Sequence, residues 1–229
     1  MPADGTFRAL LVDYGGVMTS SMGRVFAAFC LEAGVDPSVL KDLIGDAYGG
    51  GDPGGVMARM ERGEIPLEKF EQWMADALSE GLERPLDWEG LKDRMNAGMV
   101  PDAMMMEAVR RARTSGIRTA LVSNSWGGGA YQRERFPELY DQVVISGEVG
   151  ARKPEPPIYL LTAERLRVAA EQCVFVDDLL QNVEGARAVG MEGIVHRSAE
   201  FTVPKLEALF GVALSQLGPT GNDSVPSAR

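Results

Sequence analysis

The feature that most constrains the fold is a series of short apolar runs separated by longer segments with helical periodicity. The runs cover residues 7–12, 117–122, 142–146, 173–176 and 193–196. Each run is rich in valine, isoleucine or leucine, as expected for strands whose two faces are both covered by helices. Strands that alternate with helices form parallel βαβ units. The chain is therefore predicted to be an α/β protein built on a doubly wound parallel sheet.

The stretch between the first two predicted strands is too long to be a simple crossover. It shows helical patterns, namely MGRVFAAFCLEAG, PSVLKDLIGDAY and PLEKFEQWMADALSEG, and no convincing strand. We interpret this stretch as an α-helical cap inserted after the first strand. The predicted division is a core of residues 1–19 and 99–211, a helical cap of residues 20–98 and a disordered tail of residues 212–229.

Composition narrows the possible partners. A formal charge of -10 leaves no basic surplus to replace the counterions of a nucleic acid, so no nucleic-acid partner is expected. No apolar run approaches the roughly 18 residues needed to span a bilayer, and the N-terminus lacks the pattern of a secretion signal. These features predict a cytoplasmic protein without a membrane partner. No uninterrupted heptad pattern indicates an assembly, so the oligomeric state stays open.

Polar side chains follow four of the predicted strands, at the sheet edge where doubly wound proteins bind ligands. They are Asp13 after the first strand, Ser123 and Asn124 after the second, Lys153 after the third, and Asp177 and Asp178 after the fourth. Neighbouring carboxylates repel one another, so the pattern favours a shared hard cation such as Mg²⁺, held by Asp13 and one of the later pair. Lys153 would relieve the same repulsion and neutralise a substrate phosphate. Ser123 and Asn124 would hydrogen-bond to the phosphate oxygens.

Four segments of the chain resemble the ordered motifs of the haloacid dehalogenase (HAD) superfamily. They are DYGGV at 13–17, SN at 123–124, KPEPPIY from 153 and VDDLLQNVEGARAVGM from 176. The resemblance covers residues 7–17 and 100–196, and the helical insertion matches the position of that superfamily's cap. The last two segments are most similar to the branch that contains the N-terminal phosphatase domain of soluble epoxide hydrolase.

The resemblance implies a role for each residue of the site. Asp13 is expected to attack phosphorus and form an aspartyl-phosphate that water then hydrolyses. Ser123 and Lys153 are expected to bind the transferring phosphoryl group, and Asn182 lies where this branch often has a polar residue near the site. The implied Mg²⁺ ligands are Asp13, the backbone carbonyl of Gly15 and Asp178, with Asp177 as a further candidate.

Gly15 departs from the motif, because family phosphatases usually have an aspartate two positions after the nucleophile. That aspartate provides general acid and base help, which is typically worth about 10²- to 10⁴-fold in rate. The leading hypothesis is a Mg²⁺-dependent phosphomonoesterase of weak activity, acting on a small phosphorylated metabolite. One alternative is a metal-independent 2-haloacid dehalogenase, although that pattern lacks the pair Asp177 and Asp178. The other is a catalytically impaired HAD-fold binding protein, which Gly15 supports.

Overall fold

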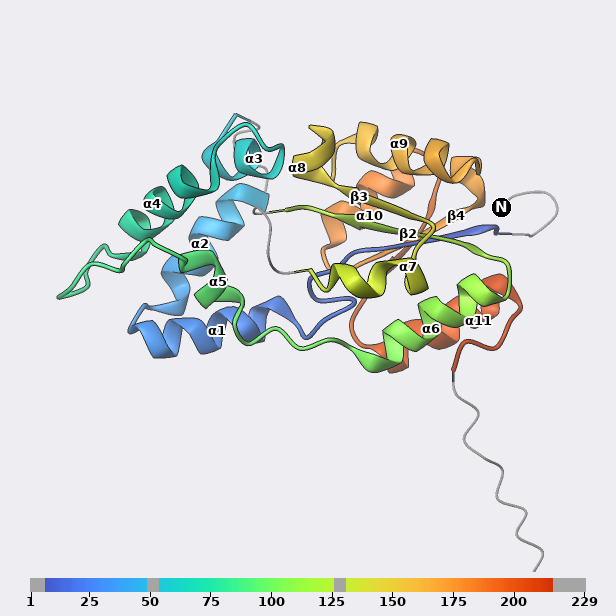
Figure 1. Ribbon diagram of the computed structural model, residues 1–229, viewed down its shortest axis with the longest axis horizontal. Helices are drawn as coiled ribbons and strands as arrows, with labels where there is room; N and C mark the ends of the chain where they lie inside the picture. Colours follow the sequence, from blue (N-terminus) through green and yellow to red (C-terminus); the bar gives the residue numbers. More distant parts are fainter. Residues whose placement is uncertain (1–6, 49–53, 126–130, 216–229) are drawn as a thin grey trace, which may run out of the picture.

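The computed structural model describes residues 7–48, 54–125 and 131–215, and it has the α/β fold predicted from the sequence (Figure 1). Within these residues, five parallel strands form one sheet in the order β3-β2-β1-β4-β5. The strands are β1 (Ala9–Val12), β2 (Arg118–Ser123), β3 (Gln142–Ile145), β4 (Cys173–Asp177) and β5 (Glu192–Val195). Each strand overlaps one of the predicted apolar runs, so the sequence pattern identified the sheet.

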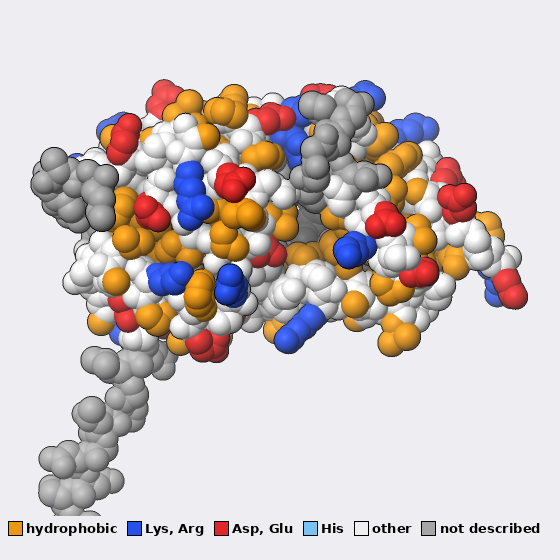
Figure 2. All heavy atoms as spheres, turned by 180° about the vertical axis from the view of Figure 1, so that it is seen from behind, with side chains coloured by type: hydrophobic (Ala, Val, Ile, Leu, Met, Phe, Trp, Pro, Cys, Tyr) orange, Lys and Arg blue, Asp and Glu red, His pale blue; other side chains and the backbone are white. Residues whose placement is uncertain are grey.

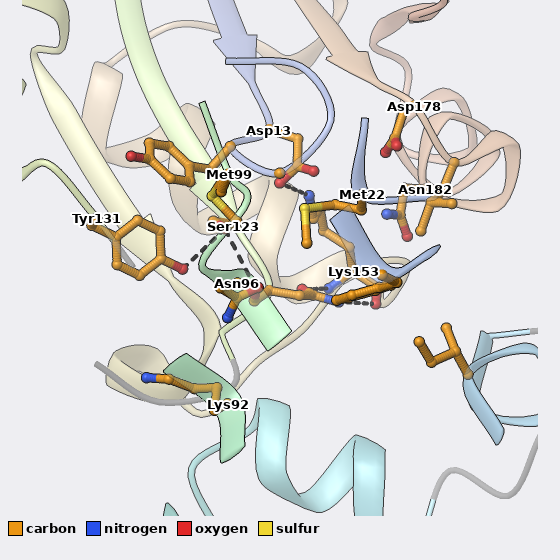
Figure 3. A pocket seen from close by; sticks show the side chains of 16 residues that line it. Asp13, Met22, Lys92, Asn96, Met99, Ser123, Tyr131, Lys153, Asp178 and Asn182 are labelled. Carbon is orange, nitrogen blue, oxygen red and sulfur yellow. Dashed lines mark hydrogen bonds and ion pairs between the residues drawn. The ribbon is translucent and has the colours of Figure 1, made fainter. Parts of the chain in front are cut away.

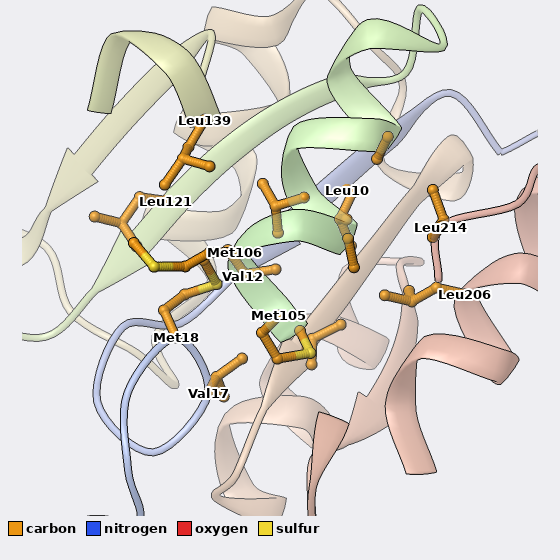
Figure 4. Close-up of a cluster of buried hydrophobic side chains, with 14 of the residues drawn as sticks. Leu10, Val12, Val17, Met18, Met105, Met106, Leu121, Leu139, Leu206 and Leu214 are labelled. Carbon is orange, nitrogen blue, oxygen red and sulfur yellow. The ribbon is translucent and has the colours of Figure 1, made fainter. Parts of the chain in front are cut away.

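Helices cover both faces of the sheet, which explains why its strands are apolar on both sides. One face carries α9 (Pro156–Leu166) and α10 (Leu180–Ala188), and the other carries α6 (Ala103–Thr114), α7 (Phe136–Leu139) and α11 (Ala199–Phe210). Leu10 and Val12 of β1 pack toward α6 and α11, as Figure 4 shows, whereas Ala9 and Leu11 pack toward α9. Short elements complete the core: η1 (Arg133–Arg135), α8 (Ser146–Val149) and η2 (Ala170–Gln172).

The C-terminal region differs from the prediction. Helix α11 was not indicated by the sequence, and residues 212–215, which were assigned to a disordered tail, pack against it. Leu214 is completely buried (Figure 4), and the Glu207 Oε1 atom accepts hydrogen bonds of 2.7 Å from the backbone nitrogens of Leu214 and Ser215. The prediction was wrong here because one leucine and one helix carboxylate fix this segment, and composition does not reveal such contacts. Residues 216–229 lie outside the described part of the chain.

A helical insertion follows β1 and has its own apolar core. It consists of α1 (Met22–Ala33), α2 (Pro37–Tyr48), α3 (Val56–Glu61), α4 (Leu67–Leu78) and α5 (Leu91–Asn96). Phe70, Met74 and Leu91 belong to the buried apolar cluster between these helices. The sequence predicted α1, α2 and α4 but not α3 or α5, which are six residues each and too short for periodicity to be visible. The division into core and cap domains stays a prediction.

Two adjacent connections join the helical insertion to the sheet. The backbone nitrogen of Ser20 donates to the carbonyl oxygen of Val100 at 2.7 Å, and that of Asp102 donates to Met18 at 2.9 Å. Thr19 and Pro101 form an isolated antiparallel bridge between the same segments. The chain therefore leaves and re-enters the sheet region at one place.

The surface is hollowed between the helical insertion and the sheet, as Figure 2 shows from behind. On that face, lysine and arginine side chains are interspersed with acidic ones. Among the helices of the described ranges, none combines the length and the apolar character needed to cross a membrane.

Candidate active site

The carboxyl ends of β1, β2 and β4 bring the predicted polar residues together. Val12 of β1 is in register with Leu121 of β2 and with Val176 of β4. Asp13, the residue after β1, donates its backbone N–H to the carbonyl of Val176 at 2.9 Å. Because the strands are parallel and in this register, the side chains that follow them lie around one pocket (Figure 3). The structure therefore brings these residues together, and their roles stay predictions.

Lys153 lies between two carboxylates. Its Nζ atom is 2.6 Å from Asp13 Oδ1 and 2.7 Å from Asp177 Oδ2, and its side chain is only 1% exposed. Burial alone would lower the pKa of the lysine, but the attraction of Asp13 and Asp177 holds that pKa above its ordinary value. The ammonium group is therefore charged at neutral pH and is fixed beside Asp13.

Asp13, Asp177 and Asp178 form an acidic cluster in which one oxygen of each lies within 4.8 Å of the others. Burial raises the pKa of Asp13 to about 7, with Lys153 opposing the rise and the other two carboxylates adding to it. Burial and the neighbouring Asp177 raise the pKa of Asp178 to about 6. A cation bound among these oxygens would remove this penalty, so the cluster is suited to a hard metal ion.

The two adjacent aspartates have different surroundings. Asp177 is completely buried: its Oδ2 accepts from Lys153, and its Oδ1 accepts from the backbone of Leu179 at 2.9 Å and from Asn182 Nδ2 at 3.0 Å. Asp178 instead lines the pocket. Protein donors therefore engage both oxygens of Asp177, whereas Asp178 faces the space where a ligand would bind.

Gly16 is required by the close approach of Asp178. Its φ angle is +79°, a conformation that glycine adopts without strain. A Cβ atom at this position would also clash with Asp178 Oδ2. The glycine in the DYGG segment thus allows the turn after β1 to lie against the second aspartate.

Ser123 and Asn124, which follow β2, line the same pocket. Tyr131, which the sequence did not indicate, donates its hydroxyl to Ser123 Oγ at 3.0 Å. Asn124 accepts from the backbone N–H of Lys153 at 2.8 Å and donates its Nδ2 to the carbonyl of Lys153 at 3.0 Å. The geometry therefore gives Asn124 a role in holding the Lys153 segment, and its contact with a substrate stays a prediction.

Asn182 is buried next to the acidic cluster. Its Nδ2 atom donates to Asp177, and the hydroxyl of Tyr159 donates to its backbone carbonyl at 2.7 Å. Its Oδ1 atom is buried and has no hydrogen-bond partner among the described residues. A buried acceptor of this kind suits a ligand group or a bound water that donates a hydrogen bond. Substrate binding by Asn182 stays a prediction.

The pocket above these groups has a volume of about 190 Å³. Besides the polar residues described above, four apolar residues of the helical insertion and its connection to α6 line the pocket: Met22, Phe26, Ile44 and Met99. Lys92 and Asn96 of α5 also line it, one helical turn apart. The sequence did not indicate these residues, because no motif marks them and helix α5 was not predicted.

Met22 lies beside Gly15. A Cβ atom on Gly15 would lie 3.2 Å from Met22 Cγ and 3.3 Å from its Sδ. These distances are tighter than ordinary contacts, although a methionine side chain is flexible enough to move. The methionine therefore fills the space that a side chain at residue 15 would need.

Comparisons with known proteins match this chain to a hydrolase family and to phosphatases and epoxide hydrolases. A family model for haloacid dehalogenase-like hydrolases matches residues 7–190. A bifunctional epoxide hydrolase 2 from Sus scrofa is 27% identical over 243 residues, which cover 96% of this chain and 42% of that protein. A sesquiterpene phosphatase from Aspergillus oryzae is 30% identical over 212 residues, which cover 90% of this chain and 98% of that protein. The chain spans less than half the length of the first curated relatives that it matches.

Solved structures share the fold at low sequence identity. A HAD family enzyme from Bacteroides thetaiotaomicron, in complex with magnesium and inorganic phosphate, has a TM-score of 0.56 and 17% identity. The alignment covers 83% of this chain and 94% of that one. This likeness concerns the fold alone.

Proposed function

This chain belongs to the haloacid dehalogenase-like hydrolase family, and on that premise we propose that it is a Mg²⁺-dependent phosphomonoesterase whose nucleophile is Asp13. The observation that carries the proposal is the position of the Lys153 ammonium between Asp13 and Asp177, with Asp178 beside them. A nucleophilic carboxylate, a fixed cation and a further acidic group are what phosphoryl transfer through an aspartyl-phosphate requires. A metal-independent dehalogenase has no need for the second acidic group, so Asp178 supports the phosphatase.

In the proposed reaction, Asp13 attacks phosphorus and the ester oxygen leaves with the organic group. Lys153 neutralises charge on the transferring phosphoryl group, and Ser123, with its hydroxyl hydrogen-bonded to Tyr131, binds one of its oxygens. Water then hydrolyses the aspartyl-phosphate and regenerates the Asp13 carboxylate. Gly15 provides no acid or base, so good leaving groups should react best.

The residues present fit a Mg²⁺ ion. Asp13, Asp178 and the backbone carbonyl of Gly15 would hold it, because these are oxygen donors and Asp177 is already engaged by protein donors. When bound, the ion would add positive charge that stabilises the phosphoryl group during transfer. The buried and unpartnered Oδ1 of Asn182 would accept from a water in this region.

The pocket supports a substrate whose organic part is largely apolar. Met22, Phe26, Ile44 and Met99 line the pocket together with Asp13, and apolar walls contribute affinity only when they cover an apolar group. The relative from Aspergillus oryzae is named for a sesquiterpene substrate, which agrees with such a lining. We therefore infer a small phosphate monoester of an apolar alcohol as the substrate class.

The proposal is tested by phosphate release from three monoesters, with Mg²⁺ and with chelator. The probes are p-nitrophenyl phosphate, an isoprenyl monophosphate and glucose 6-phosphate. We expect Mg²⁺-dependent release, with kcat/KM higher for the isoprenyl ester than for the sugar ester. Release that persists in chelator would contradict the metal requirement, and a preference for the sugar ester would contradict the assigned substrate class. Release of halide from 2-haloacids, without phosphate release, would favour the dehalogenase.

Mg²⁺ is expected to stabilise the protein more at pH 7.5 than at pH 5.5. The pKa values of Asp13 and Asp178 are raised to about 7 and about 6 in the metal-free protein. Between about pH 4 and pH 7 the folded chain therefore binds more protons than the unfolded chain, and these two groups lower stability as pH rises. Within that window Mg²⁺ must displace protons from these carboxyl groups, so its apparent affinity should be about 10- to 100-fold lower at pH 5.5 than at pH 7.5.

Thermal unfolding with and without Mg²⁺ measures this pH effect. Ca²⁺ serves as the comparison, because it also takes oxygen ligands but prefers a larger, more flexible site. A Mg²⁺-induced shift of equal size at both pH values would mean that the ion does not bind at these carboxylates.

An aspartate introduced at residue 15 is expected to raise kcat only when the neighbouring Met22 is also replaced by a smaller residue. In Gly15→Asp alone, the new side chain must displace Met22, so we expect little gain in kcat for poor leaving groups. The double variant Gly15→Asp/Met22→Ala should raise kcat for an alkyl phosphate by about 10²-fold relative to Met22→Ala. The same comparison with p-nitrophenyl phosphate should show a smaller gain, since its leaving group needs no proton. An equal gain for both esters would show that the new acid does not protonate the leaving group.

A further inference from the structure

We propose that Glu61, at the end of helix α3 in the helical insertion, is a positioning residue that holds Asn124 and, through it, the catalytic segment around Lys153. The inference rests on the proposed function only in that Lys153 takes part in the reaction. It adds a contact through which the helical insertion positions a catalytic residue without contacting the substrate.

Glu61 is fully buried although it carries a carboxylate and comes from the helical insertion. Its Oε2 atom accepts a hydrogen bond of 2.5 Å from Arg152 Nε and one of 3.0 Å from Asn124 Nδ2. Both partners belong to loops at the carboxyl edge of the sheet. A single carboxylate oxygen thus joins the insertion to two residues that adjoin the proposed active site.

Asn124 transmits this contact to Lys153. Its Oδ1 atom accepts from the backbone N–H of Lys153, and its Nδ2 atom donates to the backbone carbonyl of the same residue. The Nδ2 group has two hydrogens, so the bonds to Glu61 and to Lys153 use both of them. Removing the Glu61 acceptor would leave one hydrogen of a partly buried amide without this partner and would loosen the orientation of the amide that holds the lysine backbone.

The end of α3 is docked on the core around this contact. Arg62 Nη1 donates to Glu155 Oε1 at 3.0 Å. A Cβ atom on Gly63 would lie 2.6 Å from the carbonyl oxygen of Gly147 in α8, so the two backbones meet closely. The chain connections at Thr19 and Pro101 are elsewhere in the sequence, so α3 provides a second attachment between the insertion and the core. Glu61 is the member of this attachment that reaches Asn124.

A buried ion pair such as Glu61 and Arg152 is weak evidence of a role in stability. Transfer of two charges from water costs several kcal/mol per ion, and apolar residues of similar volume often replace such a pair without loss. A geometric role accounts for the pair, because Glu61 Oε2 accepts from Asn124 Nδ2 while the same amide group holds the Lys153 backbone.

The test uses two double variants that differ only at the acceptor. Glu61→Met/Arg152→Met removes both charges of the pair together with the acceptor. Glu61→Gln/Arg152→Met removes both charges but keeps an amide oxygen for Asn124. Arg62→Met is the matched control, because it breaks a neighbouring contact between the insertion and the core without touching Asn124. All are assayed as full-length chains with p-nitrophenyl phosphate and Mg²⁺.

We expect kcat of the Met/Met variant to fall by about 10- to 100-fold, since small misplacements of catalytic groups have effects of this size. KM should change little. The Gln/Met variant should recover most of kcat, and Arg62→Met should stay close to the wild-type value. Equal kcat in the two double variants, or an equal loss in Arg62→Met, would overturn the proposal.

A second readout separates this inference from the proposed reaction. By NMR, the side-chain amide protons of Asn124 should exchange faster in Met/Met than in Gln/Met, and the backbone amide signal of Lys153 should differ between the two. If the wild type releases no phosphate from any ester, the proposed function fails, and these signals alone decide the role of Glu61. Identical Asn124 exchange and Lys153 signals in the two variants would overturn it.

Discussion

Replacing Asp13 with asparagine is expected to abolish phosphate release, lowering kcat by more than about 10⁴-fold, the scale seen when a covalent nucleophile is removed. An amide oxygen is too weak a nucleophile to attack phosphorus, although it fits the same space. The substitution should leave the fold intact, because Lys153 keeps Asp177 as its partner. It also removes a carboxyl group whose burial is costly, as its raised pKa indicates. We therefore expect a thermal midpoint equal to or above that of the wild type.

The measurement is single-turnover and steady-state phosphate release, with Asp76→Asn as the control. Asp76 is an exposed aspartate on α4, so the control makes the same chemical change away from the site. Turnover of Asp13→Asn within tenfold of the wild type, in protein free of contaminating phosphatase, would contradict the nucleophile assignment; tenfold corresponds to about 1.4 kcal/mol of barrier.

Replacing Lys153 with methionine is expected to reduce both activity and stability. The loss of its charge beside the phosphoryl group should lower kcat by about 10³-fold or more. The loss of the cation between Asp13 and Asp177 leaves uncompensated buried charge, which typically costs about 3–5 kcal/mol of unfolding free energy. Since Lys153 is almost completely buried, solvent screening does not reduce this cost.

The stability loss in Lys153→Met should depend on pH with a defined sign. Without the ammonium group, which opposes the rise, the pKa values of Asp13 and Asp178 increase further, so the folded variant binds more protons than the unfolded chain. The unfolding free energy relative to wild type should therefore decrease as pH rises from about 5 to about 8 in chelator. Lys153→Arg keeps the charge and should recover stability more than activity, because its planar group does not reproduce the position of the ammonium. Equal stability of the methionine variant and the wild type at pH 8 would contradict the ion pairs.

The sheet could be predicted from the sequence because its strands are buried on both faces. Such strands appear as short apolar runs that need no tertiary information to recognise. Helices α3 and α5 were missed because six residues do not display a helical period. Helix α11 and the packing of Leu214 depend on contacts with the core, and composition does not report such contacts.

The proximity of the polar residues was also predictable, because parallel strands bring the residues that follow them to one edge of the sheet. The sequence did not distinguish Asp177 from Asp178, since that difference arises from the burial of Asp177 among Lys153, Leu179 and Asn182. Glu61, Met22 and Lys92 carry no local signal. They approach the strand ends because the helical insertion packs on the core. No short sequence pattern predicts this packing.

The measurement that tests the central claim most directly is chemical trapping of the phosphorylated residue. The wild-type protein is mixed rapidly with p-nitrophenyl phosphate and Mg²⁺, quenched, and reduced with borohydride, which converts an aspartyl-phosphate to homoserine. Because Gly15 supplies no base to activate water, the intermediate should accumulate. Mass spectrometry is predicted to find homoserine at residue 13 in the wild type and at no other aspartate. Phosphate release with residue 13 recovered as unmodified aspartate in every quenched sample would contradict the account.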